Sequence, residues 1–334
     1  MANKQRSWWP VLVLWTSGIC AQDAQVSQFY ALPTYLNPAF VGTSLQTRFA
    51  LGFRDQWPSI PGAFVTYNAA FDHYMSNLNS GVGVLLTHDR AGSGALRYTQ
   101  VAAQYAYEIE LKRKVFIRPA LQVGMVQHAV DLSRLTFGDQ LARGGDIATY
   151  EHVDGLNTKY GDVAAGALYF TPKMWLGISA HHLNAPNQSL LLNESRVPLR
   201  LGMHGGYRFA LKSPIIKEHP ESIVAAFNYR AQGKYDQLDL GAYYEREPFF
   251  AGLWYRGIPL FKSFSPGYAN NDAIAALIGL MVKDMRIGYS YDLTISRLAG
   301  YSGGAHEVTL TIELADKRKK RSITKRRIVP CAKF

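Results

Sequence analysis

The chain has 334 residues, of which 48% are hydrophobic, and its 36 Lys and Arg outnumber its 25 Asp and Glu, for a formal net charge of +11. That hydrophobic fraction is ample for a core and two cysteines are too few for a disulfide scaffold, so a disordered chain and a disulfide-stabilised miniprotein are both excluded. Residues 316–334 carry 9 basic residues and 1 acidic residue, which leaves the rest of the chain nearly neutral. A nucleic-acid partner is therefore not expected, because it would need basic residues clustered on the folded surface.

The N-terminus has the pattern of a secretory signal peptide. Two basic residues precede an apolar stretch over 8–19, and Cys20 and Ala21 follow it. We predict a signal peptide over 1–21, cleaved near Cys20 or Ala21. A lipoprotein signal is the alternative, but a large isoleucine stands before the cysteine, where that signal needs a small residue. Removal of Cys20 would leave Cys331 without an internal disulfide partner.

The rest of the chain alternates with a period of two. The longest apolar run, 273–282, is too short to cross a bilayer as a helix. In the first periodic segment Phe49 and Phe53 share one face, and Arg48 and Arg54 share the other. Such alternation is typical of β-strands with two different environments.

A membrane barrel explains this alternation better than a soluble sandwich. The periodic segments are long, their polar faces carry charges that suit a wet lumen, and aromatic residues gather near their ends. We predict an all-β fold, an antiparallel transmembrane outer-membrane β-barrel over 46–315 with about 14 strands. The expected strands are 46–57, 62–72, 81–89, 95–111, 114–128, 159–170, 173–183, 197–211, 222–232, 235–246, 248–256, 273–283, 285–294 and 305–315.

The connections favour one orientation of this barrel. From the fourth strand onward, tight turns mostly alternate with long loops, as periplasmic turns alternate with outer loops. The long loops are 129–158, 184–196, 257–272 and 295–304. The exceptions are a long connection after the eighth strand and short outward turns after strands one, three and nine. This orientation makes 22–45 a periplasmic N-terminal segment, and the even strand number makes 316–334 a basic periplasmic tail.

No catalytic or metal-binding pattern stands out. In each of three adjacent pairs the two side chains point to opposite faces of a strand, so none of the pairs is expected to chelate one ion; the pairs are Asp72-His73, His88-Asp89 and His181-His182. The nucleophile motif G-x-S-x-G is absent from the sequence. We therefore expect no enzyme, no cofactor and no metal site.

Charged residues on the polar faces are expected in the lumen. They are Arg48, Arg54, Arg118, Arg200, Arg208, Arg230 and Arg286, with Glu108, Asp239, Glu307 and Glu313. They either line a solute channel or form an ion-paired, plugged interior, and we favour the second because a barrel interior must compensate its charges in both cases.

The basic tail is a candidate docking segment. Anionic lipid head groups are one possible ligand, but apolar character returns over 328–334, which favours docking to a protein. The candidate docking residues are Lys317, Arg318, Lys319, Lys320, Arg321, Lys325, Arg326, Arg327, Cys331 and Phe334.

Several segments resemble one family in their order and spacing. They are Gln28-Phe29-Tyr30 with Leu36-Asn37-Pro38-Ala39-Phe40-Val41-Gly42, then Phe53-Arg54-Asp55-Gln56-Trp57, the stretch from Asp131 to Gln140, and Gly303-Gly304-Ala305-His306-Glu307. Together they resemble the PorP/SprF family of Bacteroidetes outer-membrane proteins. The residues that match the family are Asn37, Pro38, Ala39, Gly42, Gln56, Trp57, Asp131, Leu135, Phe137 and Asp139. One departure is that the last strand ends in Glu313-Leu314-Ala315, without a terminal aromatic residue.

The resemblance implies a non-enzymatic outer-membrane component of the type IX secretion and gliding machinery. Its implied partners are outer-membrane lipid, periplasmic ring or peptidoglycan-binding proteins, and secreted adhesin cargo. Asn37, Pro38, Ala39 and Gly42 would form a structured periplasmic approach to the first strand, and Gln56 and Trp57 would lie at the outer rim. A passive channel or hydrophobic-solute transporter is one alternative function, and a surface adhesin is another.

Overall fold

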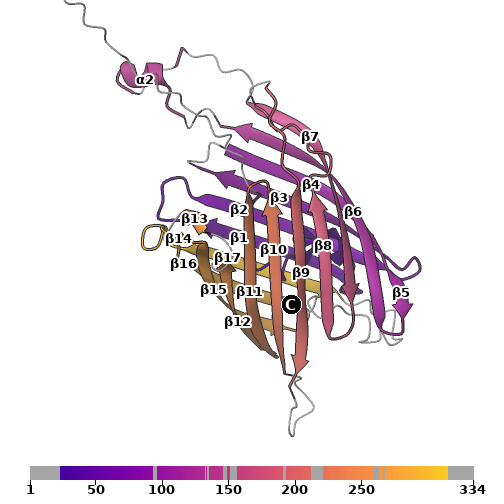
Figure 1. The fold of residues 1–334 in the computed structure, drawn as a ribbon. Coiled ribbons are helices and arrows are strands. Elements are labelled where there is room, and N and C mark those ends of the chain that lie inside the picture. The colour runs from indigo at the N-terminus through magenta and orange to yellow at the C-terminus, as the bar shows by residue number, and fades with distance from the viewer. Residues whose placement is uncertain are drawn as a thin grey trace, which may run out of the picture.

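The strands of this protein close into a single barrel. The computed structural model describes residues 23–314 apart from 93–95, 132, 134, 146–148, 151–155, 191–192, 212–220, 259–262 and 266–267. Over these residues the chain forms a closed antiparallel barrel of fourteen strands (Figure 1). The predicted fold class is confirmed.

The barrel strands are β1 (Thr47–Gln56), β2 (Phe64–Met75), β3 (Ser80–Ala91), β4 (Leu96–Tyr107), β5 (Ile109–Lys112), β6 (Val115–Val130), β7 (Asn157–Phe170), β8 (Met174–His181), β9 (Arg200–Ala210), β10 (Ser222–Gln232), β11 (Tyr235–Arg246), β12 (Phe249–Gly257), β15 (Asn271–Val282), β16 (Met285–Thr294) and β17 (Ala305–Leu314). β4 and β5 both pair with β6 and act as one strand. The remaining elements are the helical turn α1 (Pro33–Leu36), the 3₁₀ turn η1 (Pro38–Phe40), the short helix α2 (Gly138–Ala142) and the hairpin of β13 (Ser263–Ser265) and β14 (Tyr268–Ala269).

The barrel closes by pairing of its first and last strands. Each strand pairs with its neighbours in sequence, and β1 pairs with both β2 and β17. Across this seam Phe49 lies opposite Phe71 on one side and Ile312 on the other. Neighbouring antiparallel strands need only hairpin connections, so alternating segments separated by turns are enough to build this wall.

The two faces of the wall have opposite chemistry. In β4 the side chains of Val101 and Tyr105 are each 47% exposed on the outside, while Gln104 is buried in the lumen. In β1 the side chains of Arg48 and Arg54 likewise point inward and are buried. Successive side chains of a strand point to opposite faces, so the period of two in the sequence produces this division. An apolar outer face is what a barrel needs in a bilayer.

The two ends of the barrel differ in their connections. One end, here called the short-turn end, has the tight connections 76–79, 113–114, 171–173, 247–248 and 283–284. The other, the long-loop end, has 131–156, 182–199, 258–270 and 295–304, and α2 lies within the first of these, beyond the ends of the strands (Figure 1). Two of the predicted exceptions to this division are observed. The connection 211–221 is long although it lies at the short-turn end, and 233–234 is a tight turn at the long-loop end.

Residues 23–46, here called the plug, lie inside the barrel. The side chains of Phe29, Leu32 and Phe40 are all buried there. This differs from the expected periplasmic location of 22–45. The physical reason is that the wall side chains of a fourteen-stranded barrel leave interior space, and an apolar segment is removed from water when it fills that space.

Two of the expected segments cannot be compared with the structure. The predicted signal peptide over 1–21 and the basic tail over 316–334, which includes all ten candidate docking residues, lie outside the described residues. Within the described residues, no helix is long and apolar enough to span a membrane.

Candidate functional site in the filled lumen

The plug is attached at its N-terminal end through Asp23. One carboxylate oxygen of Asp23 lies 2.7 Å from the guanidinium of Arg200 and 2.9 Å from Nε2 of His182, and its backbone N–H donates to the side chain of Gln232. Burial alone would raise the pKa of Asp23, but the Arg200 and His182 cations hold it well below its usual range. Asp23 is therefore a charged anchor between β8, β9 and β10.

Further into the lumen, Ser27 sits at the centre of a charged cluster. Its hydroxyl donates to Asp292 (2.5 Å) and accepts from Arg54 and Arg256 (2.7 Å each). Its backbone N–H donates to Glu307 (2.7 Å). The two arginines also pair with the wall carboxylates directly, Arg54 with Asp292 at 2.9 Å and Arg256 with Asp292 at 3.0 Å. Buried charges need such compensation, and here the plug and the wall share it.

The predicted lumen charges are indeed inside and mostly paired. The further ion pairs join Arg48 to Asp72, Arg118 to Glu108, Arg208 to Glu245, Arg256 to Asp239 and Arg286 to Glu313. Arg230 lines the space between the plug and β10. The ion-paired interior that we favoured over an open channel agrees with this arrangement.

Asn37 fastens the middle of the plug to the wall. Its amide nitrogen donates to the backbone oxygens of Ala167 on β7 (3.3 Å) and Ile178 on β8 (2.9 Å), and its amide oxygen accepts from the N–H of Ala39 (2.9 Å). The last bond caps η1, which begins with Pro38. A family residue expected in a periplasmic turn thus connects two barrel strands to the plug.

The C-terminal end of the plug lies very close to the wall at Gly42. The backbone N–H of Gly42, a residue with φ of +74°, donates to Asp72 on β2 (2.8 Å), and Asp72 also pairs with Arg48 (2.7 Å). On the neighbouring strand, a Cβ added to Gly81 would lie 2.1 Å from the backbone oxygen of Val41. Glycine at position 81 is therefore required for this approach.

Arg118 connects the same part of the plug to β6. Its side chain is fully buried, pairs with Glu108 at 2.8 Å and donates to the backbone oxygens of Ala39 (3.2 Å) and Val41. One guanidinium thus compensates a buried carboxylate and two plug carbonyls.

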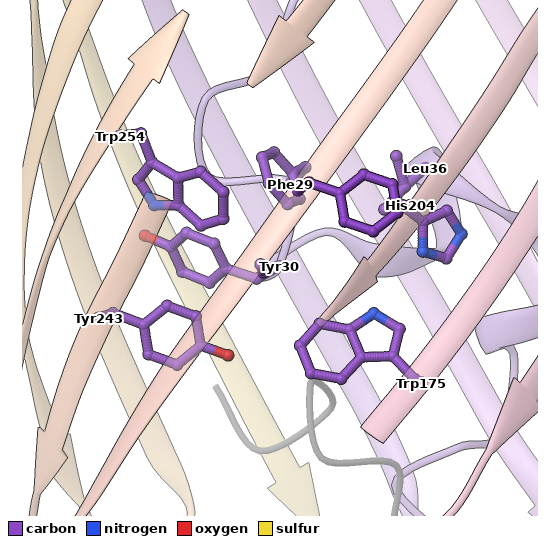
Figure 2. A pocket seen from close by; sticks show the side chains of 9 residues that line it. Phe29, Tyr30, Leu36, Trp175, His204, Tyr243 and Trp254 are labelled. Atoms are coloured by element: carbon purple, nitrogen blue, oxygen red, sulfur yellow. The ribbon is translucent and has the colours of Figure 1, made fainter. Parts of the chain in front are cut away.

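Apolar and aromatic side chains also pack the plug against the wall. Phe29 and Tyr30 of the plug face the wall residues Trp254, Tyr243 and Trp175 around a narrow pocket (Figure 2). The ring centroids of Phe29 and Trp254 are 4.8 Å apart in an edge-to-face contact, and those of Tyr30 and Tyr243 are 5.9 Å apart. These contacts remove the apolar part of the plug from water.

The other family residues form two separate groups at the long-loop end. Gln56, the last residue of β1, accepts from Arg54 (3.3 Å), and Trp57 donates its backbone N–H to Gly304 (2.8 Å). Asp139 at the start of α2 accepts from the backbone N–H of Tyr150 (2.8 Å).

The remaining three family residues surround this loop structure. Asp131 pairs with Arg97, Phe137 precedes α2, and the side chain of Leu135 is exposed. These contacts lie in and beside the 131–156 connection.

Three important lumen residues were not predicted: Asp23, Ser27 and Arg256. The alternation places Arg256 on the same face of its strand as Trp254. That face carries both a charge and an aromatic ring, so it does not stand out as a polar, lumen-facing one. Asp23 and Ser27 precede the first periodic segment, so no local pattern marks them. Within the described residues, no group of three or more His, Cys, Asp and Glu side chains is arranged to hold a metal ion.

Comparison with known proteins gives one match to a family and several to solved structures. A family model described as type IX secretion system membrane protein PorP/SprF matches residues 19–312. Similar solved structures are the Acinetobacter baumannii outer membrane protein Omp33 (TM-score 0.44, 8% identity, 81% of this chain and 99% of that chain) and the P. putida toluene transporter TodX (TM-score 0.46, 10% identity, 83% and 92%). No curated protein matches the chain. The family match covers the plug and nearly all of the barrel.

Proposed function

Because this chain belongs to the PorP/SprF family of type IX secretion system membrane proteins, we propose that it supports export or surface attachment of adhesin cargo by docking periplasmic partners. The barrel is the outer-membrane part of this function. The basic tail supplies the docking segment in this proposal. The strand that precedes it, β17, ends at Leu314, which pairs with Thr47 at the short-turn end.

Apart from the family match, the observation that supports this proposal is that the plug fills the lumen. The plug is held by ion pairs and hydrogen bonds at Asp23, Ser27, Asn37 and Gly42, from one end of the barrel to the other. A filled, charge-compensated interior supports an anchoring role. It offers little support to the alternative of a passive channel or hydrophobic-solute transporter.

The docking role is tested by pull-down from cell envelopes. We expect deletion of 316–334 to abolish recovery of periplasmic ring or peptidoglycan-binding proteins, while the barrel remains in the outer membrane. A matched variant keeps the length of the tail and replaces its eight basic residues at 317–321 and 325–327 with glutamine. Loss of partners in this variant too would assign docking to the charges. Recovery of the same proteins by the deletion variant and the full chain would contradict the proposal.

A further inference from the structure

The plug runs through the lumen in one direction, from the long-loop end to the short-turn end. The partners of Asp23 are all at the long-loop end: His182 directly follows β8, Arg200 begins β9 and Gln232 ends β10. At the other end of the plug, Gly42 bonds to Asp72, close to the tight 76–79 turn.

The contacts between these two ends follow the same order. Ser27 meets Asp292 near the end of β16 and Glu307 near the start of β17, which are both in the half of the barrel near the long loops. Asn37 meets β7 at Ala167, three residues before the short-turn end of that strand. The direction is therefore set by a series of bonds along the lumen and not by one contact.

The connections identify which end faces outward. Outer-membrane barrels have short periplasmic turns and longer loops on the cell surface, so Asp23 lies at the surface mouth. Leu314, the last residue of β17, lies at the opposite end, beside Thr47.

We propose that the exported chain presents its N-terminal end at the cell surface, within reach of proteins on that side, and continues from β17 into the periplasm. The plug then connects a contact point on the surface with the wall near the periplasm. This inference does not depend on the docking function of the tail.

Cysteine labelling on intact cells tests this topology. Ala24→Cys, next to the anchor, is made in a chain carrying Cys20→Ala and Cys331→Ser, and is treated with a membrane-impermeant maleimide. Two controls are Tyr301→Cys, in the exposed 295–304 loop, and Leu78→Cys, in the exposed 76–79 turn. We expect Ala24→Cys to be labelled on intact cells, as Tyr301→Cys is, while Leu78→Cys is labelled only after permeabilisation. Labelling of Ala24→Cys only after permeabilisation would overturn the proposal.

A second variant tests the location of the N-terminal end of the plug independently. An epitope inserted directly before Asp23 is expected to bind antibody on intact cells, with barrel folding checked by heat-modifiable electrophoretic mobility. Antibody binding only in permeabilised cells, with the barrel folded, would overturn the surface location of this end.

Discussion

At the scale of single residues, the plug is held by charged groups that each satisfy several partners. Arg118 is the clearest case, because its guanidinium is fully buried and contacts Glu108 and the backbone oxygens of Ala39 and Val41. Removing one partner of a buried ion pair leaves the other charge uncompensated, which costs more than the pair itself contributes.

We predict that Arg118→Met lowers the free energy of unfolding by about 3–5 kcal/mol, because Glu108 stays buried without its partner. Denaturant unfolding of the detergent-solubilised barrel measures this change. The matched control is Arg196→Met, which removes an exposed ion pair with Glu194 and should cost less than about 1 kcal/mol. The double variant Arg118→Met/Glu108→Gln should recover part of the loss. Equal losses of unfolding free energy in Arg118→Met and in the control would show that the buried Arg118–Glu108 pair is no more important for stability than an exposed one.

The attachment of the plug at His182 is expected to depend on pH. Burial alone would lower its pKa, but the Asp23 carboxylate and hydrogen bonds to Asp162 and Asp23 outweigh burial and raise the pKa from 6.5 to about 9. The group holds its proton more tightly in the folded protein than in the unfolded one. Its stabilisation is thus fully present below pH 6.5 and is lost as the pH rises through 9.

We predict that the thermal midpoint of the solubilised barrel falls between pH 6.5 and 9, and that His182→Gln reduces this fall. Thermal unfolding followed by circular dichroism across this range measures both proteins. His73→Gln is the control, because the His73 side chain bonds to Thr47 in an exposed contact. An unchanged pH dependence in His182→Gln would show that the coupling with Asp23 does not stabilise the fold.

At the scale of elements, the plug and the wall have complementary surfaces, but the wall needs the plug less than the plug needs the wall. Wall charges also pair among themselves, as Arg54 does with Glu307 (3.0 Å) and Arg256 does with Asp239 (2.9 Å). The barrel wall therefore keeps much of its charge compensation without the plug. The plug, by contrast, satisfies many of its carbonyls internally but needs the wall to bury its apolar side chains and to compensate the charge of Asp23.

We predict that deletion of 24–44 leaves a folded barrel that conducts ions in planar bilayers, whereas the full chain is closed. The reason is that the deletion empties the lumen while the wall pairs persist. Deletion of 138–142, which removes α2 in an outer loop, is the control and should leave the barrel closed. Steady conductance by the full chain would instead favour the passive channel.

At the scale of the whole molecule, two kinds of contact hold the plug along the lumen. Charged groups contact it around Asp23 and Ser27 near the long loops and at Arg118 near the short turns, and aromatic side chains contact Phe29 and Tyr30. The charged contacts fix position through directional bonds, and the aromatic contacts remove apolar surface from water. Together they hold one segment along the full length of the barrel.

The sequence by itself determined the wall of this protein. Strand positions, the inward face of residues such as Arg48 and Arg54, and the contrast between short turns and long loops all follow from local rules. A strand alternates its side chains with a period of two, and a hairpin joins neighbours, so each feature is written in a few adjacent residues.

Only the tertiary structure decided what fills the barrel and what pairs with what. Ser27 and Glu307 are 280 positions apart, and Asp23 and Gln232 are 209 positions apart, yet each pair is hydrogen-bonded. The family residues Asn37 and Gly42 indicated an ordered segment, but not that it lies inside the lumen. That location depends on the space left by closure of all fourteen strands, a property of the whole barrel that no local pattern contains.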